Sequence, residues 1–98
     1  MKGNNVIVDK SKKFALRIVK AYKYLADKNE YVLSKQMLRS GTSIGANVKE
    51  AIRAQSKPDF IAKMSIALKE ASETEYWIEL LTESEYLSVQ SGTSLKNE

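Results

Sequence analysis

The chain has 98 residues, of which 43% are hydrophobic and 29% are charged; this composition is typical of one small globular domain and argues against a disordered chain. It contains neither cysteine nor histidine, which excludes disulfides and thiolate metal sites and removes the commonest general base and transition-metal ligand. The net charge of +4 is divided unevenly, with +6 over residues 1–28, +3 over residues 29–57 and −5 over residues 58–98.

This division of charge has two interpretations. In the first, antiparallel helices of opposite charge attract one another, either within a subunit or between subunits. In the second, the basic part of the chain forms an exposed face for a polyanion such as RNA or DNA. The sequence alone leaves both interpretations open.

The first predicted helix covers residues 11–28, after a short extended or frayed lead-in over residues 1–8. Its apolar residues recur at the spacing of an amphipathic helix, at Phe14, Ile18, Ala21 and Leu25. The cations on its other positions are the candidate nucleic-acid-binding residues: Lys12, Lys13, Arg17, Lys20 and Lys23. Tyr24, flanked by Lys20, Lys23 and Lys28, could stack on a nucleobase, although surface tyrosines beside lysines are common.

The second predicted helix covers residues 35–55, with Ser34 as its predicted N-cap. Its apolar positions alternate at four and three residues, as in a coiled-coil seam: Met37, Gly41, Ile44, Val48 and Ala51. Gly41 and Gly45 would each cost a helix roughly 1 kcal/mol relative to alanine. They either allow another helix to approach closely or mark a break, and the continuing apolar register favours one continuous helix.

The third predicted helix covers residues 57–83. Ser56, Pro58 and Asp59 are typical of a helix start, because they supply a capping serine, a first-turn proline and an acid three residues after the serine. The apolar register then runs unbroken through Phe60, Met64, Ala67, Ala71, Thr74, Ile78 and Leu81. A fourth helix is predicted to begin at about residue 88, with Ser88 as its cap. Few residues remain for it, so we expect this helix to be incomplete in the chain.

Two glutamates interrupt the apolar side of the third helix. Glu70 and Glu73 lie three residues apart on one helical face, and burying two carboxylates is costly unless they are paired. The expected polar network, which would set the register between the second and third helices, consists of Arg39, Ser43, Asn47, Glu70 and Glu73. The alternatives are pairing with another subunit, a solvent-facing rim position for Asn47, and a divalent-metal or general-acid site. The last lacks the histidines of di-iron bundles.

The second and third helices also carry a family resemblance. Leu38-Arg39-Ser40-x-x-Ser43-Ile44-x-x-Asn47-x-x-Glu50-Ala51 is followed by Asp59-Phe60-x-x-Lys63-x-x-Ile66-Ala67-Leu68-Lys69-Glu70-Ala71-x-Glu73-Thr74-x-Tyr76-Trp77. Together the two motifs resemble the four-helix-bundle proteins that are encoded in intervening sequences of bacterial 23S rRNA genes. This group includes the accessory variability protein of diversity-generating retroelements. The resemblance covers roughly residues 10–90.

The resemblance implies an all-α, up-and-down antiparallel four-helix bundle that assembles as a ring-like homopentamer and has no known enzymatic activity. Its retroelement members are basic and bind nucleic acid and a reverse transcriptase, whereas most other members are of unknown function. The family's last helix is longer than the segment left here, so the chain is expected to stop within it.

We therefore expect one helical-bundle domain over residues 1–98 that is not an enzyme and has no catalytic residue, cofactor or metal site. The first functional hypothesis is an oligomeric accessory factor that binds RNA or DNA through its basic surface, with a reverse transcriptase or another nucleic-acid enzyme as a candidate partner. The alternative is a protein-interaction scaffold with no nucleic-acid role. No segment has the length and apolarity of a membrane span or signal peptide, which predicts a cytoplasmic protein that does not contact membranes.

Overall fold

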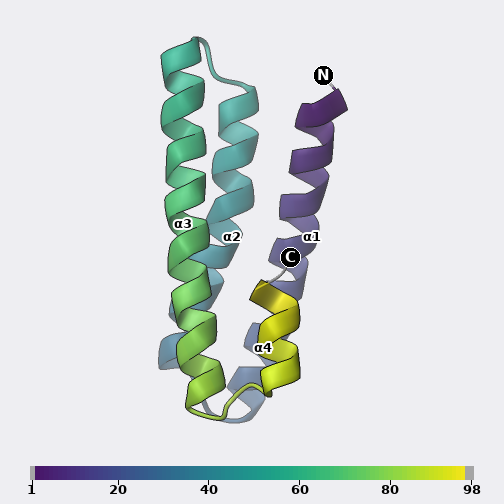
Figure 1. The fold of residues 1–98 in the computed structure, drawn as a ribbon, viewed down its shortest axis with the longest axis vertical. Coiled ribbons are helices and arrows are strands. Elements are labelled where there is room, and N and C mark those ends of the chain that lie inside the picture. Colours follow the sequence, from purple (N-terminus) through teal and green to yellow (C-terminus); the bar gives the residue numbers. More distant parts are fainter. Residues whose placement is uncertain (1, 97–98) are drawn as a thin grey trace.

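The computed structural model describes residues 2–96, with side chains described from residue 6 onward. This part of the chain forms four α-helices that run alternately up and down (Figure 1). The helices are α1 (Lys2–Asp27), α2 (Val32–Ile52), α3 (Lys57–Glu83) and α4 (Val89–Lys96). The predicted all-α bundle is therefore confirmed. No helix among residues 2–96 combines the length and apolarity needed to cross a membrane.

The helix α2 lies between α1 and α3, and the short α4 packs at one end against α1 and α3 (Figure 1). No Cα atom of α1 lies within 8 Å of a Cα atom of α3 among the described residues. The bundle thus has three long helices in a row, and α4 covers only the end of the space between the outer two.

The helix α1 begins at Lys2, so the predicted extended lead-in and the predicted start near Ser11 are wrong. Ser11 does not cap the helix; its hydroxyl donates to the carbonyl of Val8, 3.0 Å away, inside the helix. The β-branched residues Val6 and Val8 have modest helix propensity, which favoured an extended segment. Ile7 and Ser11 line the groove between α1 and α3, and the helix continues through them despite that local preference.

The helix α2 begins at Val32 and ends at Ile52, three residues before the predicted bounds at each end, and Ser34 lies inside it. Glu30 takes the capping role that was predicted for Ser34. Its buried carboxylate accepts hydrogen bonds from the backbone N–H groups of Leu33 and Ser34, at 3.2 and 2.7 Å. A carboxylate at the N-terminus of a helix also interacts favourably with the helix dipole.

The helices α3 and α4 begin as the sequence predicts. Ser56 accepts a hydrogen bond from the backbone N–H of Asp59 at 3.2 Å, and α3 spans the predicted range. Ser88 similarly accepts a hydrogen bond from the backbone N–H of Ser91 at 3.1 Å and caps α4. Both helices therefore start where a local side-chain cap satisfies first-turn donors.

The glycines of α2 lie where α1 crosses it. A Cβ atom on Gly41 would stand 2.9 Å from Cγ2 of Ile18, and one on Gly45 would stand 3.4 Å from Oγ of Ser11. The helix continues through both positions, so the predicted continuous helix and close approach are confirmed. The absence of a side chain at Gly41 allows α1 to bury Ile18 against the α2 backbone.

The hydrophobic core lies at the end of the bundle where all four helices meet. Its fully or almost fully buried members are Ile18, Leu25, Met37, Ile78, Leu81, Leu87 and Leu95. All four helices contribute to this cluster, and Leu87 is added from the connection before α4. The opposite end of the bundle has α1, α2 and α3 but no fourth helix among the described residues.

Candidate nucleic-acid interface

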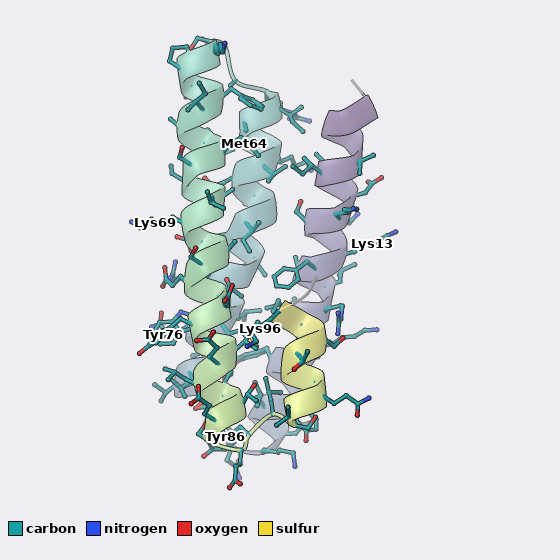
Figure 2. All side chains as sticks on the ribbon, viewed as in Figure 1. Lys13, Met64, Lys69, Tyr76, Tyr86 and Lys96 are labelled. Carbon is teal, nitrogen blue, oxygen red and sulfur yellow. The ribbon has the colours of Figure 1, made fainter. Side chains whose placement is uncertain are left out.

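The predicted nucleic-acid-binding residues all lie on α1. Lys12, Lys13, Lys20 and Lys23 are exposed, and Arg17 is partly buried. At about 100° per residue, Lys13, Arg17 and Lys20 share one stripe of the helix, and Lys12 and Lys23 share the neighbouring one. Figure 2 shows Lys13 pointing away from the other helices, on the opposite side of the molecule from Lys69 and Tyr76.

This basic face is free of acidic residues over most of its length. Between Asp9 and Asp27 the chain has six cations and no acid. None of the four predicted lysines forms an ion pair with another residue of the described chain. Their charges are therefore not neutralised within the bundle, and they produce a positive potential along the outside of α1.

Arg17 connects the basic face to α4. Its guanidinium donates to the hydroxyl of Ser94 at 2.9 Å and to the backbone carbonyl of Ser94 at 3.4 Å. The two residues are 77 positions apart in the sequence. Arg17 thus holds α4 against α1, in addition to the nucleic-acid contact that was predicted for it.

A pocket of about 500 Å³, which we call the α1–α4 pocket, opens beside this contact. From α1 it is lined by Arg17, Lys20 and Tyr24, and from the α4 side by polar residues that include Ser88, Ser91 and Ser94. No acidic residue of the described chain lines it. The ring of Tyr24 is 50% exposed, and Nζ of Lys28 lies 5.0 Å from its centroid. Tyr24 thus lies beside Lys28, and the pocket combines positive charge, hydroxyl groups and an aromatic face.

The predicted polar network is only partly assembled. Arg39 forms ion pairs with Glu70, at 3.3 Å, and with Glu73. Ser43 and Asn47 do not reach the glutamates; each donates a hydrogen bond to a carbonyl one turn earlier in α2, at 2.6 and 2.8 Å respectively. Three residues form this network: the Arg39 side chain is 50% exposed, whereas the side chains of Glu70 and Glu73 are 14% and 31% exposed.

The buried polar contact between α2 and α3 involves two residues outside the predicted network. The hydroxyl groups of Ser40 and Thr74 are 2.7 Å apart, and both residues are fully buried. The sequence signal for this pair is weak, because small hydroxyl residues at seam positions pack like alanine or valine. The capping role of Glu30 was also not predicted. A carboxylate in a loop can be recognised as a helix cap only when the first residue of the helix is known.

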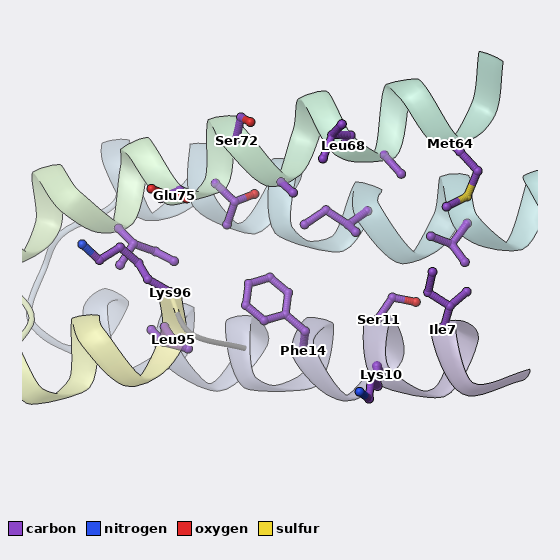
Figure 3. Close-up of a pocket in the computed structure, with 16 residues that line it drawn as sticks. Ile7, Lys10, Ser11, Phe14, Met64, Leu68, Ser72, Glu75, Leu95 and Lys96 are labelled. Carbon is purple, nitrogen blue, oxygen red and sulfur yellow. The ribbon is translucent and has the colours of Figure 1, made fainter. Parts of the chain in front are cut away.

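An apolar groove runs between α1 and α3 above α4 (Figure 3). Phe14 points into it from α1, Met64 and Leu68 border it on α3, and Leu95 lies at the end where α4 stops. Its volume is about 510 Å³ and its lining is mainly apolar. Lys10 and Glu75 lie on its rims, so the groove itself has no concentration of charge.

The helix α3 is acidic, in contrast to α1. It carries five glutamates, at Glu70, Glu73, Glu75, Glu79 and Glu83. Glu79 pairs with Lys96 at 3.9 Å, and Glu70 and Glu73 pair with Arg39. No cluster of three or more potential metal-ligating residues occurs in the described chain. The two outer helices of the bundle therefore present opposite charges.

Comparisons with known proteins agree on one family. The family described as 23S rRNA-intervening sequence protein matches residues 3–98. A crystal structure from Bacteroides thetaiotaomicron, of a protein with unknown function from the S23 ribosomal protein family, superposes with a TM-score of 0.92. That protein is 58% identical in sequence, and the match covers 93% of this chain and 85% of the other. No curated protein matches the chain.

Proposed function

The chain belongs to the family of 23S rRNA-intervening sequence proteins, and within that family we propose that it is a non-enzymatic, oligomeric bundle that binds nucleic acid through the basic face of α1. The observation that carries the proposal is the run of six cations without an acid between Asp9 and Asp27. Four of these cations, at Lys12, Lys13, Lys20 and Lys23, are exposed and have no acidic partner within the described chain.

The charge distribution also orients the proposed interaction. A polyanion is attracted to α1 and repelled by the net negative charge of α3. The glutamates that resembled a catalytic pair, Glu70 and Glu73, are engaged by Arg39. This engagement supports a structural use for them and leaves α1 as the charged surface available to a partner.

The proposed assembly is a homopentamer, as the family resemblance implies. Several large apolar residues outside the core are more than half exposed, including Ile61 and Leu68 on α3, and contacts between copies would cover such residues. Five copies would carry a formal charge of +20, and weak phosphate contacts would then act together. Light scattering should give a mass near 55 kDa, five times the 11.0 kDa of one chain. A mass of 11 kDa across micromolar concentrations would contradict the assembly.

Nucleic-acid binding is tested by titrating a labelled RNA and a labelled DNA duplex at two salt concentrations. The test variant replaces Lys12, Lys13, Lys20 and Lys23 with glutamine. The matched control makes the same change in net charge at four exposed lysines outside α1, at Lys35, Lys49, Lys57 and Lys69. We expect the α1 variant to reduce the dependence of log K on log salt for duplex DNA by about 3 to 4, since each phosphate contact contributes about 0.9. The control variant should leave most of the slope intact.

Equal loss of affinity in the two variants would argue that the net positive charge of the whole protein attracts nucleic acid, with no defined binding face on α1. Weak binding that does not respond to salt would reject nucleic-acid binding altogether. A reverse transcriptase or another nucleic-acid enzyme would be a further partner of the same complex. Pull-down of such an enzyme with the α1 variant and with the control variant would test whether binding of the enzyme depends on bound nucleic acid.

A second candidate function, a protein-interaction scaffold, is favoured by one specific observation. Leu16 is 55% exposed in the middle of the basic face, between Lys12 and Lys20. An apolar residue ringed by lysines fits a protein surface with acidic residues, such as α3 of a neighbouring copy. Under this hypothesis, Leu16→Gln lowers the mass measured by light scattering, whereas under nucleic-acid binding it leaves the mass unchanged.

A further inference from the structure

We propose that the α1–α4 pocket holds one unpaired nucleotide of a single-stranded nucleic acid, with the base against the ring of Tyr24 and the adjoining phosphate at Lys20. This inference rests on the proposed function, because it assigns a strand type and a binding pocket to the same basic face. The pocket volume of about 500 Å³ lies within the range of about 300 to 1,000 Å³ that small-molecule sites occupy.

The pocket contains the groups that a nucleotide requires. Lys20 supplies a positive charge for a phosphate, and Arg17 adds a second charge beside its contact with Ser94. Ser88, Ser91 and Gln90 supply hydroxyl and amide groups that can bond to base edges or sugar hydroxyls. Among residues 6–96 no acidic side chain lines the pocket, so none of these residues repels a phosphate there directly.

Tyr24 selects for an unpaired base. Tyr24 is 50% exposed and lines the pocket, with Lys20 one turn before it on α1 and Lys28 four residues after it, just beyond the end of α1. Aromatic side chains bind single strands by stacking on a base face, and that face is inaccessible inside a duplex. The ring between two lysines therefore distinguishes a single strand from a duplex of equal charge.

The stripe of cations provides a path for the rest of the strand. Lys13, Arg17 and Lys20 follow one another at four and three residues, which is about 4.5 to 6 Å per step along the helix axis. Lys28, just beyond the end of α1, supplies a further cation, with Nζ 5.0 Å from the Tyr24 ring centroid. A single strand that follows α1 can thus meet cations on both sides of the base in the pocket.

The test compares three probes of equal length: a thymidine 12-mer, an abasic 12-residue deoxyribose-phosphate chain, and a 12-base-pair DNA duplex. Each labelled probe is titrated at low and physiological salt with the wild-type protein and three variants. Tyr24→Leu removes the aromatic ring, Tyr24→Phe keeps it, and Tyr76→Leu is the control, because Tyr76 has a similar exposure of 53% on the opposite side of the bundle (Figure 2). Far-ultraviolet circular dichroism confirms that each variant remains helical.

We expect wild type and Tyr24→Phe to bind the thymidine 12-mer about tenfold more tightly than the abasic chain, which has the same backbone charge, since stacking on one aromatic ring supplies an effect of that size. Tyr24→Leu should remove this preference and leave binding of the abasic chain unchanged. Tyr76→Leu should behave as wild type. Repeating the titration with a uridine 12-mer shows whether RNA or DNA is preferred.

Two results would overturn the inference while the proposed function stands: equal affinity for the thymidine and abasic chains, or a preference that Tyr24→Leu preserves. In both cases salt-dependent binding would persist and would still be lost when the four α1 lysines are replaced. If no probe binds in a salt-dependent way, the proposed function fails and the pocket assignment fails with it.

Discussion

Asn29 and Glu85, with φ of 64° and 69°, are the two non-glycine residues of the described chain in the left-handed backbone region. Each follows a helix end, and each is followed by a backbone N–H that bonds back to the helix: Glu30 to Leu25 at 3.0 Å, and Tyr86 to Leu81 at 2.9 Å. These 6→1 hydrogen bonds, from a backbone N–H to the carbonyl five residues earlier, are typical of Schellman motifs. Asparagine tolerates this conformation well, whereas glutamate does not.

Glycine should therefore be favourable at Glu85. We expect Glu85→Gly to raise the free energy of unfolding by up to about 1 kcal/mol, because glycine adopts positive φ without steric cost, although it also gains entropy in the unfolded chain. The control is Glu83→Gly in the last turn of α3. This substitution should lower the free energy of unfolding by roughly 0.5 to 1 kcal/mol. Urea denaturation at fixed protein concentration measures both. Destabilisation by both glycines would show that the strain at Glu85 is negligible.

The buried hydroxyl pair of Ser40 and Thr74 is the other feature that acts at the residue scale. We expect Thr74→Val to cost about 1 to 2 kcal/mol, because it keeps the shape but leaves the Ser40 hydroxyl with only a 3.4 Å contact to the carbonyl of Met37. Adding Ser40→Ala should recover part of that loss. Thermal unfolding of the two single variants and the double variant gives the coupling energy, and strictly additive effects would mean that the bond contributes no net stability.

At the scale of elements, α1 and α2 approach closely only because a glycine lies at the crossing. Ile18 is completely buried there and stands against Gly41, whereas Gly45 faces Ser11 with ordinary van der Waals spacing. The same residue type therefore has two different roles in one helix. Gly41 is required by packing, and Gly45 leaves room for a side chain.

Alanine should have opposite effects at these two glycines. Gly41→Ala should lower the free energy of unfolding by about 1 to 3 kcal/mol, because its Cβ would meet the stiff, β-branched stem of Ile18. Gly45→Ala should raise it by up to about 1 kcal/mol through helix propensity alone. Equal effects of the two substitutions, measured by denaturation at one protein concentration, would contradict the assigned crossing point.

At the scale of the whole molecule, the core lies at one end of a bundle that measures 43 Å along its longest axis. The helix α1 has no Cα within 8 Å of α3 among the described residues, and Ile7, Lys10 and Ser11 in its N-terminal half border the open apolar groove. Stability should therefore decrease along α1 from its C-terminal to its N-terminal half, because fewer apolar contacts oppose local opening there.

Hydrogen exchange can detect this gradient. We expect amides of residues 6–12 to exchange markedly faster than those of residues 18–25 in the same helix, since the latter surround Ile18 and Leu25, which are fully buried. Mass spectrometry of peptides from the two segments provides the measurement. Equal protection of the two segments would contradict the expected gradient of stability along α1. It would mean that another copy or a partner covers the groove.

Local patterns in the sequence determined much of this protein: the all-α class, the continuous α2, the caps and range of α3, and the basic nature of α1. These features depend on side chains within a few residues of one another, so periodicity and capping chemistry are enough to predict them. The motifs on α2 and α3 also identified the family before any fold was known.

Only the tertiary structure decided which surfaces these helices form together. It moved the start of α1 to Lys2, gave the cap of α2 to Glu30, and paired Ser40 with Thr74 in place of Ser43 and Asn47 with the glutamates. It also placed Ser94 against Arg17 across 77 positions of sequence, which creates the pocket beside Tyr24. Such contacts depend on how the helices rotate and cross, and that geometry results from burial over the whole bundle rather than from any local pattern.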